Sequence, residues 1–193
     1  MRNLIEIISP HETLEMEDFT LWACNMLSVH PKFIPTKYAW YIDKYLLSFC
    51  NIKTVFVSPK VETLPTKCFC DATKIISITI PSNVGFVENH CFCGCTNLEE
   101  INFGKNTCFD KWVTFANLFS LTKISLPTTL TKIKKFMFKN CWRLKNIDIQ
   151  KNIVKIGDFA FQNCKFLTQV KIPENVSYIG IGCFKGCISL HIF

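Results

Sequence analysis

Cysteine is the residue type with the greatest capacity for chemistry in this chain. The sequence holds 12 cysteines among 193 residues, and three of them fall in the short stretch CFCGC between Cys91 and Cys95. Clustered thiolates can bind zinc, form disulfides or act as nucleophiles. Structural zinc sites use spaced pairs of C-x₂₋₄-C form, whereas the C-x-C spacing here places the thiols on alternating sides. The sequence therefore predicts no metal site, and the cysteines need another explanation.

The four histidines offer no catalytic motif. None has a serine or carboxylate partner at the spacing of a nucleophile and its base, and the sequence contains no glycine-rich phosphate-binding loop. We therefore expect no catalytic residue and no cofactor, and the sequence favours a protein that is not an enzyme.

A repeat of 23 residues accounts for the placement of most cysteines. Counting in steps of 23 joins six phenylalanines without insertion or deletion, namely Phe69, Phe92, Phe115, Phe138, Phe161 and Phe184. Further apolar columns start at Val55, Val57 and Ile75. A fixed period of this size indicates a solenoid, in which each unit stacks on its neighbours to make one continuous core. We expect the six phenylalanines to form the central column of that core.

Two columns of the repeat contain most of the cysteines. One column holds Cys95, Cys141, Cys164 and Cys187 together with Ala72 and Leu118, and a second holds Cys68, Cys91 and Cys183 together with Ala160 and Met137. Exchange with alanine, leucine and methionine is typical of a small buried apolar position, and unpaired cysteine is often buried. Most cysteines are therefore expected in the core.

Cys70 and Cys93 do not fit these core columns. Each comes one residue after a core phenylalanine, so both are expected to point outward on adjacent coils, with Cα atoms within disulfide range. We predict a redox pair whose thiols stay reduced in a reducing compartment and join only under oxidation.

The repeat predicts short strands joined by tight turns. Val170 and Ile172 alternate with Lys171, which is the period of two expected for a strand buried on one face. The predicted fold is a β-rich repeat solenoid with a 23-residue period over residues 52–193. Its six repeats start at Val55, Ile78, Ile101, Ile124, Ile147 and Val170.

The stretch VKIPENVSYIGIGCFKGCISL, from Val170 to Leu190, resembles the BspA-like or Treponema-type leucine-rich repeats. The resemblance extends from about Val55 to Phe193. It implies a fold of the α/β leucine-rich-repeat class, a right-handed coil of short strands and tight turns. It also implies binding of other macromolecules at bacterial and protozoan surfaces, without enzymatic activity.

Residues 1–51 differ in pattern and are expected to form a helical cap on the first repeat. The stretch SPHE at Ser9–Glu12 has the form of a helix-capping box. Apolar residues then recur at helical spacing in two stripes, one around Trp22 and one around Tyr45. Such caps cover the exposed ends of solenoids.

The charge is distributed unevenly along the chain. Residues 1–100 contain 8 Lys and Arg against 11 Asp and Glu, whereas residues 101–193 contain 14 against 4. A basic surface favours acidic partners. The main hypothesis is a module that binds another protein, and the alternative is a basic module that binds nucleic acid or anionic phospholipid through its lysine-rich C-terminal half.

One outward column is the predicted partner-binding edge. It contains Phe86, Phe109, Lys132, Lys155 and Tyr178, with Lys111 and Lys134 two residues further on. Aromatic side chains flanked by positive charge suit an acidic protein surface. A second basic face would carry Lys123, Lys145 and Lys171.

The repeat over residues 101–121 breaks the pattern. Thr107 and Asp110 occupy positions that are apolar in the other repeats. Because a buried unpaired carboxylate is costly, we expect a local bulge that turns Asp110 outward and lets Phe109 or Trp112 fill the gap.

The ends of the chain lead to two further expectations. No secretory signal, membrane-spanning stretch or prenylation box is apparent, so the sequence predicts a cytoplasmic protein, while the family resemblance leaves room for association with a cell surface. The last repeat leaves an apolar edge near Leu190 and Phe193. This edge favours a homodimer, and the alternatives are pairing with another protein or fraying of the last repeat.

Overall fold

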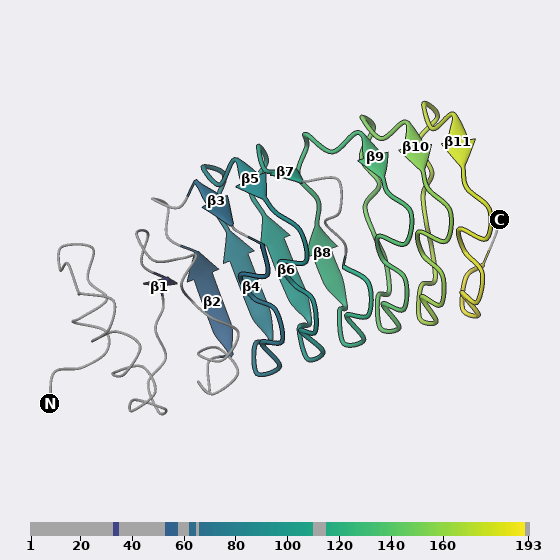
Figure 1. The fold of residues 1–193 in the computed structure, drawn as a ribbon. Helices are drawn as coiled ribbons and strands as arrows, with labels where there is room; N and C mark the ends of the chain where they lie inside the picture. Colours follow the sequence, from purple (N-terminus) through teal and green to yellow (C-terminus); the bar gives the residue numbers. More distant parts are fainter. Residues whose placement is uncertain (1–32, 35–52, 58–61, 65, 110–114, 192–193) are drawn as a thin grey trace, which may run out of the picture.

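The computed structural model describes residues 33–34, 53–57, 62–64, 66–109 and 115–191. The described chain winds into successive coils that stack side by side along one axis (Figure 1). Each coil takes about 23 residues, which confirms the predicted solenoid and its period. None of the described segments contains a helix with the length and apolarity needed to span a membrane.

One side of the solenoid is a parallel five-stranded sheet in the order β1-β2-β4-β6-β8. Its strands are β1 (Phe33–Ile34), β2 (Thr54–Val57), β4 (Ser77–Ile80), β6 (Glu100–Phe103) and β8 (Lys123–Ser125). Ile78 pairs with Val55 on one side and Ile101 on the other, in the register set by the repeat. The sheet alternates buried and exposed side chains, as predicted.

Shorter parallel strands form two further sheets of three strands each. The first sheet contains β3 (Thr63–Leu64), β5 (Phe86–Val87) and β7 (Cys108–Phe109), and the second contains β9 (Lys132–Ile133), β10 (Lys155–Ile156) and β11 (Tyr178–Ile179). In Figure 1 the two groups lie along one edge and are interrupted after β7.

Phenylalanine rings form the predicted central column. Successive rings from Phe69 to Phe184 have centroids 5.3–5.8 Å apart and are stacked at each step. Five of the six side chains are fully buried, and Phe184 is half-buried in the last described coil. The spacing follows from the separation of parallel strands, about 4.8 Å, which brings each ring onto its counterpart in the next coil.

The sheet extends into the segment for which the sequence predicts a cap. Phe33 lies opposite Phe56 and Ile34 opposite Val57, in the same 23-residue frame as the later coils. The two helices predicted within residues 1–51 fall outside the described residues, so the helical cap and its boundary stay predictions.

A column of left-handed residues makes one turn of every coil. Asp71, Asn117, Asn140 and Asn163 have φ of 60–64°. Glycine occupies the same column at Gly94 and Gly186. Asparagine and glycine tolerate this backbone conformation better than other residues. The Nδ2 of Asn140 donates to the Oδ1 of Asn117, and that of Asn163 to Asn140, each at 2.8 Å. This asparagine ladder ties three coils together.

Buried cysteines donate hydrogen bonds across the coils. The Sγ atoms of Cys95, Cys141, Cys164 and Cys187 each lie 2.9–3.2 Å from the carbonyl oxygen of the core phenylalanine in the preceding coil. Burial is the main cause that raises the pKa of the Cys95 thiol to about 12 and the pKa of Cys141 well above its ordinary value. The thiols of Cys95 and Cys141 therefore stay protonated, and the prediction that most cysteines lie in the core is confirmed.

The coil that carries β7 is shifted by one residue. Phe86 lies opposite Cys108 and Val87 opposite Phe109, a spacing of 22 residues. Phe115 is back in the central column, so the missing residue is regained before it. Phe109 is therefore turned toward the core, where its ring centroid lies 4.8 Å from that of Phe103.

Thr107 and Phe109 show how the irregular coil fills its interior. Thr107 is fully buried, and its hydroxyl has no hydrogen-bond partner. Phe109 fills the gap, as predicted. Asp110 and Trp112 lie outside the described residues, so the predicted outward position of Asp110 is not tested.

The last described coil is less well covered than the others. Val170, Ile172, Phe184 and Leu190 are half-buried and line an open hollow. Their counterparts in the preceding coil, Ile147, Ile149, Phe161 and Leu167, are buried. A homodimer through this edge stays a prediction.

Candidate functional site

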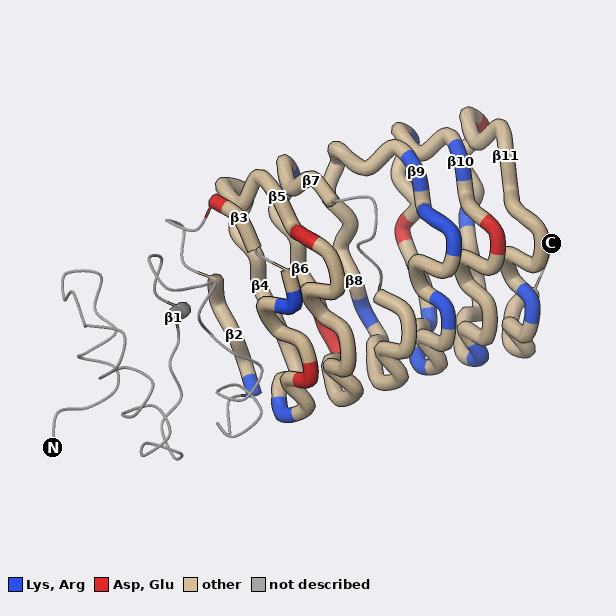
Figure 2. Tube along the Cα trace, in the orientation of Figure 1, with Lys and Arg blue, Asp and Glu red and all other residues tan. Residues whose placement is uncertain are grey.

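The second short sheet presents an exposed column of lysines and tyrosine. Lys155 on β10 lies between Lys132 on β9 and Tyr178 on β11, in parallel register. All three side chains are exposed, and each is followed by a residue of the apolar column, Ile133, Ile156 or Ile179. We call Lys132, Lys155 and Tyr178 the lysine face. It lies in the half of the solenoid where Figure 2 shows more Lys and Arg than Asp and Glu.

Asp158 is the acidic side chain closest to this face in sequence, and other groups engage it. Its Oδ1 accepts hydrogen bonds from the Tyr178 hydroxyl at 3.2 Å and from the Ile181 amide at 3.1 Å. Its Oδ2 lies 4.0 Å from the Nζ of Lys135. The bond to Asp158 raises the pKa of Tyr178 above its ordinary value. Because Lys132, Lys135 and Lys155 outnumber this single carboxylate, the surroundings of the face keep a positive balance.

The other residues of the predicted binding edge lie elsewhere. Phe86 is 39% exposed, but it belongs to the first short sheet on β5. Phe109 does not belong to the exposed edge because the one-residue shift at β7 turns it toward the core, and Cys108 is exposed in its place. Lys134 is half-buried, with its Nζ 3.5 Å from the Phe109 carbonyl oxygen. Lys111 lies outside the described residues.

Cys70 and Cys93 lie on adjacent coils, but only one of them points outward. The amides of the residues on either side of Cys70 bond to the carbonyl oxygens of Cys91 and Cys93, at 2.8 and 2.6 Å. Cys93 is exposed, as predicted. Cys70 is only 7% exposed, so the prediction that it points outward is wrong. Burial, followed by the neighbouring Cys93 and Asp71, raises the pKa of Cys70 to about 11. The redox pair stays a prediction.

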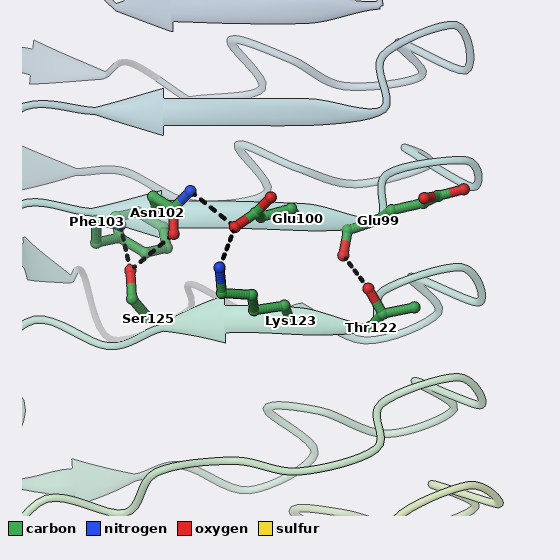
Figure 3. A network of polar contacts seen from close by, with 7 residues as sticks. All are labelled: Glu99, Glu100, Asn102, Phe103, Thr122, Lys123 and Ser125. Carbon is green, nitrogen blue, oxygen red and sulfur yellow. Dashed lines mark hydrogen bonds and ion pairs between the residues drawn. The ribbon is translucent and has the colours of Figure 1, made fainter.

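A polar network on the outer face of the large sheet was not predicted. Lys123 on β8 donates to the Oε1 of Glu100 on β6 at 2.7 Å, and Asn102 donates to the same atom at 3.1 Å (Figure 3). Ser125 bonds the Phe103 amide and the Asn102 side chain. The hydrogen bond from Lys123 lowers the pKa of Glu100. Lys123 is therefore committed to a contact between coils, which weakens the alternative basic face that includes it.

The described residues bring no three metal-ligating side chains together in a group that could hold a metal ion. The thiols of Cys70, Cys95 and Cys141 have raised pKa values, which oppose nucleophilic chemistry. The described residues instead form a possible binding surface, because exposed side chains line up in columns from one coil to the next.

Comparison with known proteins finds repeats of the same kind. A family model described as "BspA type Leucine rich repeat region (6 copies)" matches residues 1–113 and 111–193. A crystal structure of a leucine-rich repeat protein from Bacteroides ovatus is 30% identical, with a TM-score of 0.64, over 72% of this chain and 38% of that protein.

A leucine-rich cell surface protein from Faecalibacterium prausnitzii has the same fold. It is 22% identical, with a TM-score of 0.57, over 74% of this chain and 47% of that protein. The chain thus spans less than half of either solved structure. No curated protein matches it.

Proposed function

The chain belongs to the BspA-type leucine-rich repeat family, and from that premise we propose that it is a non-enzymatic module that binds an acidic surface of another protein through its lysine face. The observation that carries this proposal is the register of β9, β10 and β11, which sets Lys132, Lys155 and Tyr178 side by side and exposed. A repeated column of this kind provides several contacts in a row from a rigid scaffold.

The composition of the lysine face favours a protein partner. Two cations and one amphipathic aromatic side chain give both electrostatic attraction and apolar contact area, and tyrosine is enriched at the centres of protein interfaces. Base stacking along a nucleic-acid strand would need aromatic rings interleaved with the cations. In the described part of this column, only the last position of the three is aromatic.

Charge reversal on the lysine face tests the proposal. Affinity capture from a lysate at low and at high salt would identify the partner, and Lys132→Glu with Lys155→Glu would then be compared with the parent. We expect association to slow by about tenfold and to become less sensitive to salt, since charges at an interface act mainly on the encounter rate.

Matched variants make the result specific to this face. Lys67→Glu with Lys74→Glu makes the same change in net charge at two exposed positions of an earlier coil, and it should leave association within about twofold of the parent, apart from long-range steering. Equal slowing by both double variants, or no change in either, would place the binding site elsewhere.

A further inference from the structure

The turns at residues 116–122, 139–145, 162–168 and 185–191 carry a second exposed surface. The Arg143 amide bonds the Phe119 carbonyl oxygen at 3.4 Å, and the Phe166 amide bonds that of Trp142 at 3.0 Å. These bonds hold equivalent turn residues next to one another from coil to coil. We call the surface the aromatic corner, and it consists of Phe119, Trp142, Arg143, Lys165, Phe166 and Ile188.

Apolar side chains protrude from this corner into solvent. Trp142 is 40% exposed, Phe166 56% and Ile188 81%. The residues that flank Trp142 and Arg143 in sequence, Cys141 and Leu144, are buried, so the turn presents its two middle residues outward. The three apolar side chains stand at the tips of successive turns, and the open hollow of the last coil is lined by other residues.

The charged side chains of the turns in the last three coils are all basic. Residues 139–145, 162–168 and 185–191 contain no Asp or Glu, and their five basic residues are Lys139, Arg143, Lys145, Lys165 and Lys185. The equivalent residues 70–76 and 93–99 of the earlier coils contain Lys74 together with Asp71 and Glu99. In Figure 2 the loops at the lower edge of the coils that carry β9, β10 and β11 are marked in blue.

Both faces of the Trp142 ring already have neighbours. The ring centroid of Phe119 lies 4.5 Å away on one adjacent coil, and the Nζ of Lys165 lies 4.7 Å from the Trp142 centroid on the other. A nucleic-acid base could stack on this indole only by displacing one of them. The exposed rim of the indole, in contrast, can enter an apolar layer without rearrangement.

We propose that the aromatic corner docks on the surface of an anionic lipid bilayer. Protruding Trp, Phe and Ile side chains would enter the boundary between head groups and acyl chains, and the surrounding cations would face the acidic head groups. Because the protruding side chains stand in a row at the tips of the turns, they can contact a flat bilayer surface together more easily than a concave site on a protein. The lysine face lies on the short strands β9, β10 and β11 and shares no residue with the aromatic corner, so this inference is independent of the proposed function.

Vesicle flotation with the full chain tests the inference. The probes are vesicles of phosphatidylcholine alone and vesicles in which about one third is phosphatidylserine, an anionic lipid. We expect binding to the anionic vesicles only. Phe166→Ser with Ile188→Ser should reduce the bound fraction by about tenfold, because each removes an inserted apolar side chain. Lys165→Glu with Arg143→Glu should reduce it at least as much and make it less sensitive to salt.

Control variants separate the corner from general charge and exposed apolar area. Ile181→Ser removes an isoleucine that is 76% exposed in the same last coil, and Lys155→Glu reverses a charge on the lysine face. Each control should bind within about twofold of the parent, since surface substitutions of this kind rarely alter the fold.

Three results would overturn the inference. They are an absence of binding to anionic vesicles, equal loss in the control variants, and binding of a single-stranded oligonucleotide that depends on the corner residues and displaces the vesicles. Loss of vesicle binding in corner variants that still bind the captured protein partner would separate this surface from the proposed function.

Discussion

The coils before and after β7 are built on the same interior columns and carry different exteriors. Phe69 and Phe92 stack with centroids 5.8 Å apart, and Phe138 and Phe161 stack at 5.3 Å. The exterior of the early coils carries Asp71, Glu88, Glu99 and Glu100, whereas that of the later coils carries the lysine face and the aromatic corner. Because stacking depends on the inward columns alone, the outward positions can diverge without loss of the fold.

The coil of β7 shows how far the repeat can deviate within one core. It shifts by one residue at Cys108 and regains the frame by Phe115, and the large sheet continues beside it from β6 to β8. The phenylalanine column stays stacked through the same coil. The interruption is therefore confined to the short strands and divides their exterior into two separate surfaces.

The largest effect should come from the shared interior. Phe138→Ala and Phe92→Ala should each lower the free energy of unfolding by about 3–5 kcal/mol, through lost burial and the cavity left behind. Phe136→Ala, at a ring that is 37% exposed, should cost much less. Urea titration measures all three, and a large difference between Phe92→Ala and Phe138→Ala would show that the two halves do not share one core.

Removal of one asparagine from the ladder should have the next largest effect. Asn140→Ala places alanine at φ of 61° and removes the hydrogen bonds to Asn117 and Asn163, so we expect a loss of about 2–3 kcal/mol. Asn140→Gly keeps the backbone conformation and should lose about half as much. Equal losses in the two variants in thermal or urea unfolding would remove backbone conformation from the explanation.

The irregular coil should become more stable when Thr107 is replaced by an apolar residue, as found at this position in the other repeats. Thr107→Val replaces a buried hydroxyl that has no hydrogen-bond partner with an apolar group of similar shape, and we expect a gain of about 1 kcal/mol. Thr79→Val, at a half-buried position on the outer face of β4, should change stability by less than about 0.5 kcal/mol. Destabilisation by Thr107→Val in urea would mean that the hydroxyl is satisfied in solution.

The ion pair between β6 and β8 should have a small, pH-dependent effect. The folded state lowers the pKa of Glu100, so its contribution to stability is present above the ordinary pKa and is lost as the pH falls through the lowered value. Glu100→Gln should cost about 0.5 kcal/mol near neutral pH, since the pair is partly exposed. This difference should vanish in acid, and a constant difference across the pH range would exclude the charge as its source.

The cysteine pair should have almost no effect on stability while it is reduced. Oxidised glutathione should join Cys70 to Cys93 and release two molecules of reduced glutathione, with the exposed Cys93 reacting first because Cys70 stays protonated. Peptide mapping by mass spectrometry should find this bond and leave Cys141 and Cys164 unmodified. Cys93→Ser should prevent the bond, and cross-links at other cysteines would contradict the assigned geometry.

The sequence alone was sufficient to predict the interior, because each inward column repeats at a constant spacing from Val55 to Leu190. It predicted that Phe109 or Trp112 would fill the gap in the irregular repeat, but it could not reveal the one-residue shift at Cys108, since one residue is lost and one regained and the total length of the coil is unchanged. The hydrogen bonds from the buried thiols also escaped prediction, because they depend on a carbonyl group of the preceding coil. The left-handed turn could have been predicted, because asparagine recurs at the repeat spacing at Asn117, Asn140 and Asn163.

Lysine labelling of the captured complex tests most directly whether the two halves share a fold and divide their surfaces. Lys67, Lys74, Lys132 and Lys155 are all exposed, so all four should react with the same acylating reagent in the unbound chain. With the protein partner bound, we expect protection of Lys132 and Lys155 and unchanged labelling of Lys67 and Lys74. Protection of the early pair, or equal protection of all four, would contradict it.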